Sequence, residues 1–382
     1  MAERVEINPS VIRWAVERSG RTASALIAKF PKIANWQSEG PARLTFVELE
    51  RLSNETHTPM GFFFLEEPPP DEVPIPDFRT VKDKGVEKLS PDLLDTIHAM
   101  QLRQSWYRNF ASEEGWSRHP FVGSARRNEG VKSVARDIRK TLGLSASWAS
   151  QLRTWEEAVS FLRSTVEALG VLIVINGCVG NNTFRVLDPD EFRGFVISDK
   201  LAPLIFINGH DSKSAQVFTI FHELAHLWVD RSGIFDLPDM GLPADATEKF
   251  CNEVAAEALI PEAELQSIWY SYAQTDAPFI GIAKHFKVSP VAAGRRALDL
   301  GLVSKKTFMD FYISHKSSAG DQKKRDTGGS FYNNQNFRIG KRFMRIVGRA
   351  AAEGRITYTE AYKLTGLNNA TFDKYLKRIE GD

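Results

Sequence analysis

The segment that most constrains the fold of this chain is His222-Glu223-Leu224-Ala225-His226. On an α-helix, residues four apart lie on one face about one turn apart, so the imidazoles of His222 and His226 can reach a single metal ion. Glu223 directly follows the first histidine. From there its carboxylate can act as a general base on a metal-activated water without binding the metal itself. Residues 214–221 are expected to form earlier turns of the same helix, whose apolar face would be buried and would hold the histidines rigid.

A third metal ligand is expected from a second helix downstream, predicted over residues 248–260 from its apolar spacing and the proline that follows. Glu248 and Asn252 lie four residues apart and share one face of this helix. In thermolysin-like zincins such a glutamate binds zinc and the residue one turn later orients a ligating histidine. Glu253 and Glu257 are rival ligands on other faces. We favour Glu248, with Zn2+ as the metal.

The two motifs together resemble those of the ImmA/IrrE family of metallopeptidases. His-Glu-Leu-Ala-His is followed here by Glu-x-x-Cys-Asn-x-Val-Ala-Ala-Glu-x-Leu-Ile-Pro. The resemblance implies a zincin-like fold in which His222 and His226 match the histidine ligands, Glu223 the catalytic glutamate and Glu248 the acidic ligand. Cys251 stands where many members have alanine, a small-for-small change that leaves the site assignment unaltered.

Composition indicates an ordinary soluble protein with room for two or three domains. The chain has 382 residues, of which 42% are hydrophobic and 25% charged, and a net charge of +1. Two cysteines provide no disulfide framework, so a reducing compartment is expected. The N-terminus lacks the apolar segment of a signal peptide, and no apolar run approaches the ~18 residues of a membrane span. A cytoplasmic location is therefore expected.

The predicted fold class is α+β and mostly helical. The expected parts are a helix-turn-helix module (1–66), a Pro-rich linker (67–89), a zincin-like peptidase domain with a small sheet (90–315), a flexible linker (316–336) and a C-terminal basic trihelical unit (337–382).

The N-terminal module is expected to contain four short helices, over residues 9–19, 22–30, 31–40 and 45–54. They resemble the Xre-type helix-turn-helix module that precedes the peptidase in many members of the ImmA/IrrE family. Lys29, Lys32 and Asn35 are the candidate DNA-binding residues. Because acidic residues follow them, a protein-binding or structural role is an open alternative.

The central part is expected to change from helices to strands before the His222 helix. Helices are predicted over 90–113, 132–143 and 154–168, and strands over 171–175, 192–197 and 203–208. An edge strand of such a sheet can hold extended substrate beside the metal. Helices predicted over 279–290 and 295–303 are expected to complete the peptidase core, with a DNA-binding pair as the alternative. The Pro-rich segment at residues 68–80 is interpreted as a linker between the N-terminal module and the peptidase. Its Pro-Asp-Phe-Arg is similar to a sequence between these modules in ImmA/IrrE relatives, and that resemblance implies the alternative that Phe78 and Arg79 dock against the peptidase.

The C-terminal tail differs from the rest of the chain in charge. Residues 303–382 hold 16 Lys and Arg against 8 Asp and Glu, a net charge of +8, so the other 302 residues carry −7. Three helices with interleaved Phe and Tyr are predicted in its final part. The functional interpretation is contact with nucleic acid or an acidic partner, and the structural one is a solvated helix bundle.

The leading functional hypothesis is a zinc endopeptidase that, by resemblance, cleaves a transcriptional repressor or antitoxin-like regulator in a stress response. Tyr270, Tyr272 and His210 are candidates for stabilising the oxyanion, and the sequence does not choose among them. The alternatives are a DNA-binding regulator that uses the zincin fold as a sensor or docking domain, and a toxin–antitoxin component that binds its own operator. The partners expected are a protein substrate and DNA, the latter through residues 1–66 and the basic C-terminus, and no membrane. The oligomeric state is left open.

Overall fold

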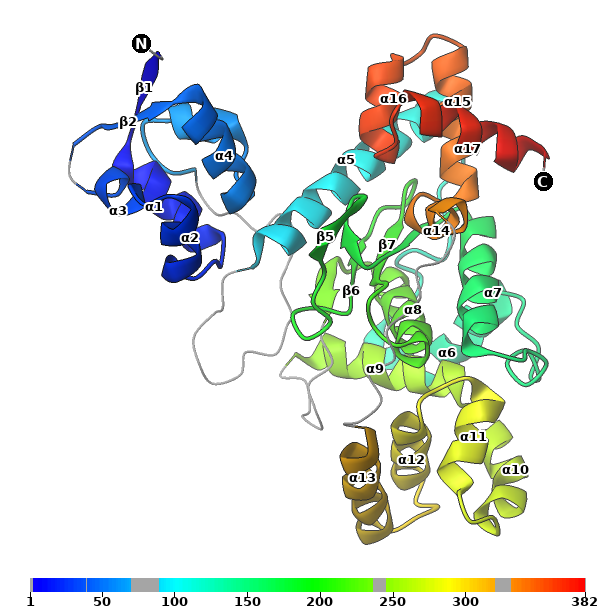
Figure 1. Cartoon of the computed structure of the whole chain (residues 1–382). Coiled ribbons are helices and arrows are strands. Elements are labelled where there is room, and N and C mark those ends of the chain that lie inside the picture. The colour runs from blue at the N-terminus through cyan, green and yellow to red at the C-terminus, as the bar shows by residue number, and fades with distance from the viewer. Residues whose placement is uncertain (1–2, 39, 70–88, 236–244, 320–330, 382) are drawn as a thin grey trace. The chain divides into compact units, whose positions relative to one another are not determined.

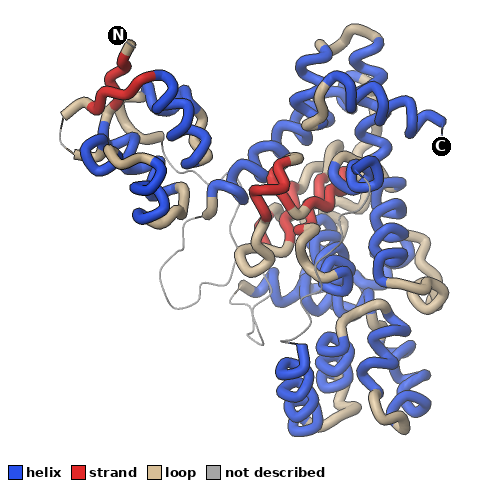
Figure 2. Tube along the Cα trace, in the orientation of Figure 1, coloured by secondary structure: helices blue, strands red, loops and turns tan. Residues whose placement is uncertain are grey.

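The computed structural model describes residues 3–38, 40–69, 89–235, 245–319 and 331–381 (Figure 1). The fold is α+β, with 59% helix and small sheets, as the sequence predicts (Figure 2). Contacts divide the chain into two compact units. One comprises Met1–Pro74 with Val81–His98, and the other comprises Ile75–Thr80 with Ala99–Asp382. Among the described residues, no helix combines the length and the apolarity that crossing a membrane requires.

The first unit contains the four predicted short helices and one small sheet. The helices are α1 (Pro9–Arg18), α2 (Ala23–Lys29), α3 (Ile33–Trp36) and α4 (Phe46–Thr56), followed by the 3-10 helix η1 (Met60–Phe64). The side chains of Asn8, Thr22 and Thr45 cap α1, α2 and α4 by accepting backbone N–H bonds, which explains where these helices begin.

The sheet of the first unit is absent from the sequence prediction. Strand β1 (Arg4–Ile7) pairs antiparallel with β2 (Ala42–Thr45). Each strand has four residues, and α1, α2 and α3 lie between the two strands in the sequence. The sequence near either strand therefore does not indicate the pairing. Most of the predicted Pro-rich linker, including Phe78 and Arg79, lies outside the described residues.

The second unit begins with three helices that confirm their predictions: α5 (Pro91–Glu113, whose first turns belong to the first unit), α6 (Val131–Thr141) and α7 (Trp155–Ala168). The predicted apolar face of α5 is buried throughout, with Leu93, Ile97, Met100 and Tyr107 each less than 5% exposed.

A four-stranded sheet positions the candidate site. Its order is β3 (Leu172–Asn176), β7 (Leu204–Asn208), β6 (Gly194–Ile197) and β8 (Gly233–Phe235). β3 and β7 are parallel, and the other pairs are antiparallel. Every residue of β3, β6 and β7 is buried, which agrees with their continuous apolar sequences. These three strands confirm the prediction, whereas the edge strand β8 and the separate hairpin of β4 (Cys178–Val179) and β5 (Asn182–Val186) were not predicted.

Two helices cover the sheet and carry the predicted metal ligands. α8 (Lys213–Trp228) packs against β6 and β7, and α9 (Ala246–Leu259) packs against α8. α7 packs on α8 and β3, so α8 is enclosed by the sheet and by neighbouring helices (Figure 1). From Phe221 to Trp228 every residue of α8 is buried.

Four further helices follow: α10 (Glu262–Ala273), α11 (Pro278–Phe286), α12 (Pro290–Asp299) and α13 (Lys305–Ala319). α11 and α12 confirm the two predicted helices, although α12 begins five residues earlier. The predicted linker at 316–336 is partly helical, because α13 ends at Ala319 and α14 (Phe331–Arg338) begins inside it; residues 320–330 are not described.

The C-terminal helices are α15 (Lys341–Ala352), α16 (Tyr358–Thr365) and α17 (Asn369–Gly381), and side chains of α5 and α7 bond to ends of α14, α15 and α16. Arg103 of α5 donates to the carbonyl oxygens of Arg338 and Thr365, at 2.8 and 3.3 Å, at the ends of α14 and α16. Glu167 of α7 accepts the backbone N–H of Arg342 at 2.8 Å, at the start of α15. These bonds satisfy helix-end groups that would otherwise lack partners.

Candidate metal centre

α8 presents the two histidines of the first motif on its face toward the sheet. The helix begins after Ser212, whose hydroxyl accepts the backbone N–H of Ala215 at 3.3 Å. Ten residues later the chain is in regular helix, so His222 and His226 project from the same face one turn apart. His222 and Glu223 are completely buried, and His226 is 2% exposed.

α9 supplies the third side chain from its first turn. Asp245 caps this helix by accepting the backbone N–H groups of Thr247 and Glu248, at 2.6 and 3.1 Å. The cap fixes where α9 begins, and thus directs Glu248, which is 3% exposed, toward α8. In the sequence, the start of α9 is indicated only by this aspartate, three residues before Glu248, because the residues around it have the composition of a loop.

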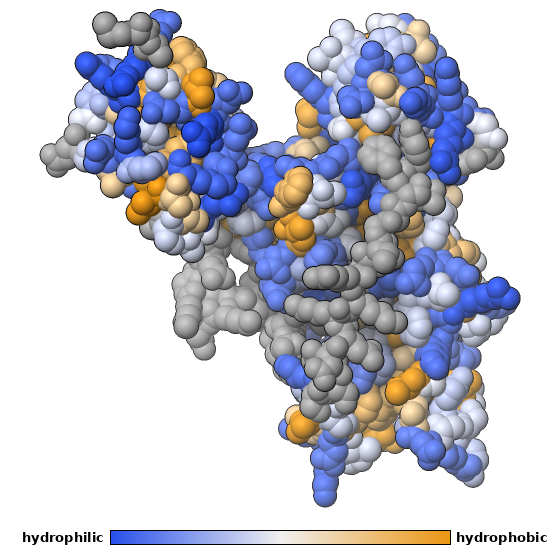
Figure 3. Space-filling view, in the orientation of Figure 1, coloured by the Kyte–Doolittle hydropathy of each residue, from blue (hydrophilic) through white to orange (hydrophobic). Residues whose placement is uncertain are grey.

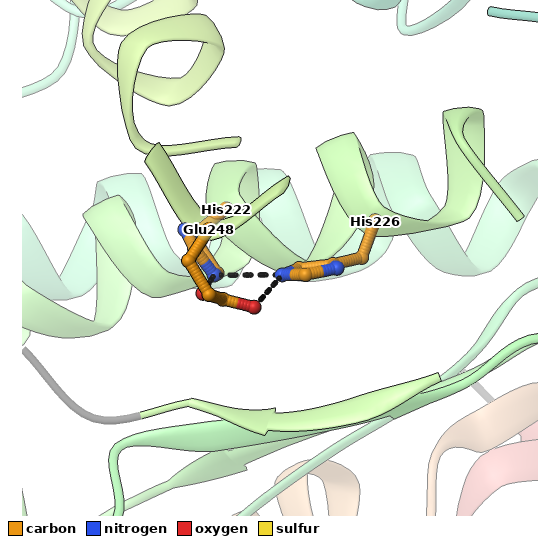
Figure 4. A group of neighbouring side chains, drawn as sticks. All are labelled: His222, His226 and Glu248. Atoms are coloured by element: carbon orange, nitrogen blue, oxygen red, sulfur yellow. Dashed lines mark hydrogen bonds and ion pairs between the residues drawn. The ribbon is translucent and has the colours of Figure 1, made fainter. Parts of the chain in front are cut away.

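The three side chains converge to form a compact triangle of ligand atoms (Figure 4). The Nε2 atoms of His222 and His226 are 3.0 Å apart. Glu248 places Oε2 at 3.2 Å from the first ring and Oε1 at 3.0 Å from the second. This is the one group of three or more potential metal-binding side chains found among the described residues.

The rival glutamates of α9 point elsewhere. Glu253 is exposed and lies 4.0 Å from Lys249. Glu257 forms an ion pair with Arg296 of α12 and accepts the backbone N–H of Glu262 at 3.3 Å. Of the three glutamates, Glu248 joins the cluster because it lies on the side of α9 that faces α8.

The protonation states favoured by the surroundings suit metal binding. Burial lowers the pKa of His222 to about 4, so its imidazole is neutral at physiological pH and has a lone pair for a metal. Burial alone would raise the pKa of Glu248, but hydrogen bonds with the two histidines outweigh it and lower that pKa to about 2. A neutral imidazole and a carboxylate are the forms that bind a divalent cation.

The donor set fits zinc. Tetrahedral zinc with bonds of about 2.0–2.1 Å separates neighbouring ligand atoms by about 3.3 Å. The two Nε2 atoms lie 3.0 Å apart, and each lies 3.0–3.2 Å from one oxygen of Glu248, which is close to that separation. Two histidines and one glutamate are the protein ligands of several catalytic zinc sites, which keep the fourth position for water or substrate.

Glu223 lies beside this triangle in an unusual environment for a carboxylate. It is fully buried, and neither carboxylate oxygen has a hydrogen-bond partner in the described part of the chain. Burial, and then the negative charge of Glu248, raise the pKa of Glu223 well above its ordinary value. A carboxylate with a raised pKa is a competent general base and, once protonated, a competent general acid.

Asn252 has the position expected of an outer partner. The amide is close enough to His222 that its hydrogen bonding raises the pKa of the imidazole, against the effect of burial. The contact is loose, because Asn252 Oδ1 finds no partner with ordinary hydrogen-bond geometry among the residues described. A contact of this kind orients a ligating ring.

Gly194 is a site residue that the sequence analysis missed. It begins β6, where it pairs with Ile207 and Phe235 in the sheet. A Cβ atom at this position would lie 2.9 Å from Glu223 Oε1 and 2.7 Å from Thr219 Cγ2. Only glycine therefore allows β6 to lie directly against the turn of α8 that carries Thr219 and Glu223. A glycine inside an apolar strand sequence was the available signal, since it often marks a close backbone approach.

Replacing Gly194 with alanine is expected to lower the free energy of unfolding of the metal-free protein by about 1–3 kcal/mol. The added methyl group would also meet the carbonyl oxygen of Phe206 at 2.9 Å, and a strand backbone cannot move aside cheaply. Urea unfolding measures the change. Gly381→Ala is the matched control, because a Cβ there has no neighbour within 4 Å. Equal stability of the two variants would contradict the close approach of β6 to α8.

The remaining candidates from the sequence do not join the cluster. Tyr270 is 76% exposed, and the Tyr272 hydroxyl lies 3.4 Å from Nδ1 of His285. His210 is exposed in the turn after β7. The structure records no contact between these three side chains and the described cluster, so the oxyanion-stabilising group stays unassigned.

The candidate DNA-binding lysines of the first unit have acidic neighbours. Lys29 forms an ion pair with Glu55 at 2.6 Å, and Lys32 lies 3.9 Å from Glu48. Asn35 is exposed and uses its backbone carbonyl oxygen to accept the Ser38 hydroxyl. These ion pairs reduce the positive charge that the two lysines can offer to a phosphate.

Comparison with known families agrees with the geometry of the site. Residues 167–298 match the IrrE N-terminal-like domain family (Peptidase_M78). The matched segment contains the four-stranded sheet, α8 and α9, and therefore the whole cluster. It supports the resemblance to ImmA/IrrE metallopeptidases over that part of the chain.

A second match lies near the C-terminus. Residues 339–378 match a domain of unknown function, DUF8813, which corresponds to α15, α16 and most of α17. No curated protein matches the chain.

Proposed function

We propose that the protein is a zinc-dependent endopeptidase in which His222, His226 and Glu248 hold the metal and Glu223 is the general base. The observation that carries this proposal is the buried, unpaired carboxylate of Glu223 beside a triangle of three ligand atoms. A buried carboxylate without partners destabilises the fold, and such groups cluster at catalytic sites. The match of residues 167–298 to a metallopeptidase family supports the same reading.

The chain's own groups divide the chemistry among them. When bound, zinc supplies a Lewis acid that polarises the scissile carbonyl and lowers the pKa of a water molecule. Glu223 accepts the proton of the attacking water and passes it to the leaving amine. Its raised pKa strengthens the carboxylate as a base for the first transfer, and the protonated carboxyl group is then the acid for the second. Asn252 keeps the ring of His222 oriented.

The substrate proposed is a transcriptional repressor or antitoxin-like regulator, as in the family that the site resembles. An extended substrate is proposed to bind along the edge strand β8. This strand pairs with β6 on one side only, and β6 lies against Glu223. The alternative is a DNA-binding regulator, or toxin–antitoxin component, that uses this fold as a sensor or docking domain. The basic C-terminal helices favour that alternative, whereas the retention of Glu223 favours the peptidase.

Metal content and proteolysis should be measured on the same preparations of wild type and Glu223→Gln. We expect about one zinc per chain in both, because Glu223 is not one of the three clustered ligands. Repressors from the same host, added as substrates, should be cleaved by the wild type only. Loss of a general base at a metal site is expected to slow cleavage by at least about a hundredfold.

Other outcomes reject parts of the proposal. Zinc in both proteins with equal cleavage would remove Glu223 from the mechanism. Zinc in both with no cleavage of any repressor would favour the regulator. Absence of bound metal from both would exclude the metal centre itself.

A further inference from the structure

The C-terminal helices form a three-helix unit around buried apolar side chains, one of which, Phe343, also packs on Trp106 and Tyr107 of α5. α15 and α17 cross so closely that a Cβ at Gly348 would lie 2.7 Å from the methyl groups of Leu376. α16 packs against both helices. The buried side chains of the unit are Phe343, Met344, Val347, Ala350, Ala361, Leu364, Leu367, Phe372, Tyr375 and Ile379. Nothing in the proposed peptidase mechanism uses this unit.

α16 and α17 are joined by a turn of three residues, 366–368. The turn begins at Gly366, which ends α16 in the left-handed conformation with φ 71°. α16 has 8 residues and α17 has 13. Two helices joined by a three- or four-residue turn that contains glycine have the connection typical of a helix-turn-helix.

α17 has one buried and one exposed face. Phe372, Tyr375 and Ile379 point into the core of the unit. The opposite line, at helical spacing of four and three residues, is Ala370, Lys374 and Lys377, all exposed. The face that Figure 3 presents over α16 and α17 is mainly hydrophilic.

Lys374 and Lys377 form no ion pair with a described carboxylate, unlike Arg349 and Arg355 of the same unit. Arg349 pairs with Glu353 at 2.8 Å, and Arg355 pairs with Glu113 and Glu114 at 2.7 and 2.6 Å. No described acidic group lies within ion-pair distance of Lys374 or Lys377. Their charges are therefore available to an external anion.

We propose that α16 and α17 form a helix-turn-helix that binds double-stranded DNA, with α17 entering the major groove. α17 is about 20 Å long and needs a groove that accepts a whole helix, as the major groove of B-DNA does. Ala370, near the start of α17, lets the helix approach the base edges closely. Lys374 and Lys377 lie along the same line and contact guanine edges or phosphates.

Duplex DNA fits this surface better than RNA or an acidic protein. The major groove of A-form RNA is too deep and narrow for a helix. Protein-binding helices present large apolar or aromatic anchors, and the outward line of α17 has none. The proposal assigns a function to the segment matched by the domain of unknown function, and it is independent of proteolysis.

The test compares full-length wild type with the double variant Lys374→Glu/Lys377→Glu. The probe is a fluorescent 25-base-pair duplex of random sequence, and binding is followed by anisotropy at several salt concentrations. The matched control is Lys305→Glu/Lys306→Glu, which makes the same charge change at exposed positions of α13. Thermal unfolding of all three proteins checks that each is folded.

We expect at least tenfold weaker binding by the Lys374/Lys377 variant and less than twofold change in the control. The slope of log affinity against log salt should fall in magnitude by about 2 if both lysines contact phosphates. Dimethyl sulfate should show protection of dG N7 by wild type, because N7 lies in the major groove. The variant should lose that protection.

Several results would overturn the proposal. The two double variants could bind the duplex equally well, which would place any DNA contact elsewhere, such as in residues 1–66. A single-stranded RNA or polyglutamate of the same charge could compete as well as the duplex. Protection of dG N7 could be absent although binding occurs. Each result would exclude α17 as a major-groove helix.

Discussion

The Glu223→Gln variant is expected to be more stable than wild type in the metal-free protein, by an amount that grows as the pH rises above 4.5. The pKa of the Glu223 carboxyl is raised by burial above its ordinary value of 4.5. The folded protein therefore holds this proton more tightly than the unfolded chain, and wild type loses stability as the pH rises through that range. The loss is up to about 1.4 kcal/mol per pH unit. Glutamine does not ionise, so the variant lacks this pH-dependent loss of stability.

Urea unfolding in the presence of a chelator, repeated between pH 4.5 and 8, measures the effect. His222 contributes the opposite slope to both proteins. Burial lowers its pKa from 6.5 to about 4, so stability due to its neutral form is present above 6.5 and is lost as the pH falls toward 4. Both proteins contain His222, so its contribution cancels when the free energy of unfolding of wild type is subtracted from that of the variant. Glu253→Gln, on the exposed face of α9, is the control and should show no pH-dependent difference. Parallel curves for Glu223→Gln and wild type would mean that the carboxylate is not destabilised.

The His226→Ala variant is expected to lose both zinc binding and the stability that zinc provides. A ligand present at 100 times its dissociation constant stabilises a protein by about 2.7 kcal/mol. His226 provides one of the three converging ligand atoms, so its removal leaves two and lowers the affinity by more than the roughly 100-fold that losing an outer partner can cost. Zinc titration with a competing chelator, followed by unfolding with and without zinc, gives both quantities.

Asn252→Ala provides a graded comparison for the same titration. Because Asn252 interacts with His222 without belonging to the triangle, its loss is expected to weaken zinc binding by about 10–100-fold. Glu253→Gln should bind zinc as wild type does. If His226→Ala retained wild-type affinity, the triangle would not be the metal site.

The sequence predicted those parts of the fold that are encoded locally. The helices α1, α2 and α4 begin at side-chain caps, and β3, β6 and β7 are continuous apolar runs. The sequence did not predict which distant segments pair as strands. β8 has three residues and becomes a strand only through β6, and β1 becomes one only through β2. The caps that α5 and α7 provide for the C-terminal helices are equally non-local.

The candidate site likewise contains residues that local sequence predicts and residues that only tertiary contacts bring together. His222, Glu223 and His226 lie within five residues of one helix, so their spacing alone places them together. Glu248 required a choice among three glutamates, which the Asp245 cap and the packing of α9 against α8 determine. Gly194 is close to Glu223 only through the contact of β6 with α8, and no property of residues 192–197 by themselves shows what faces them.

For the proposed peptidase, the burial of the metal ligands and of the general base bears on how a substrate reaches them. His222, Glu223, His226 and Glu248 are each 3% exposed or less, so we expect a peptide to bind in conformers that have opened. If one molecule in 100 is open, the apparent affinity for substrate is about 100-fold weaker than that of the open form. A regulator that binds the open form alone would then raise the turnover of the whole population by mass action, without touching any group that takes part in bond cleavage.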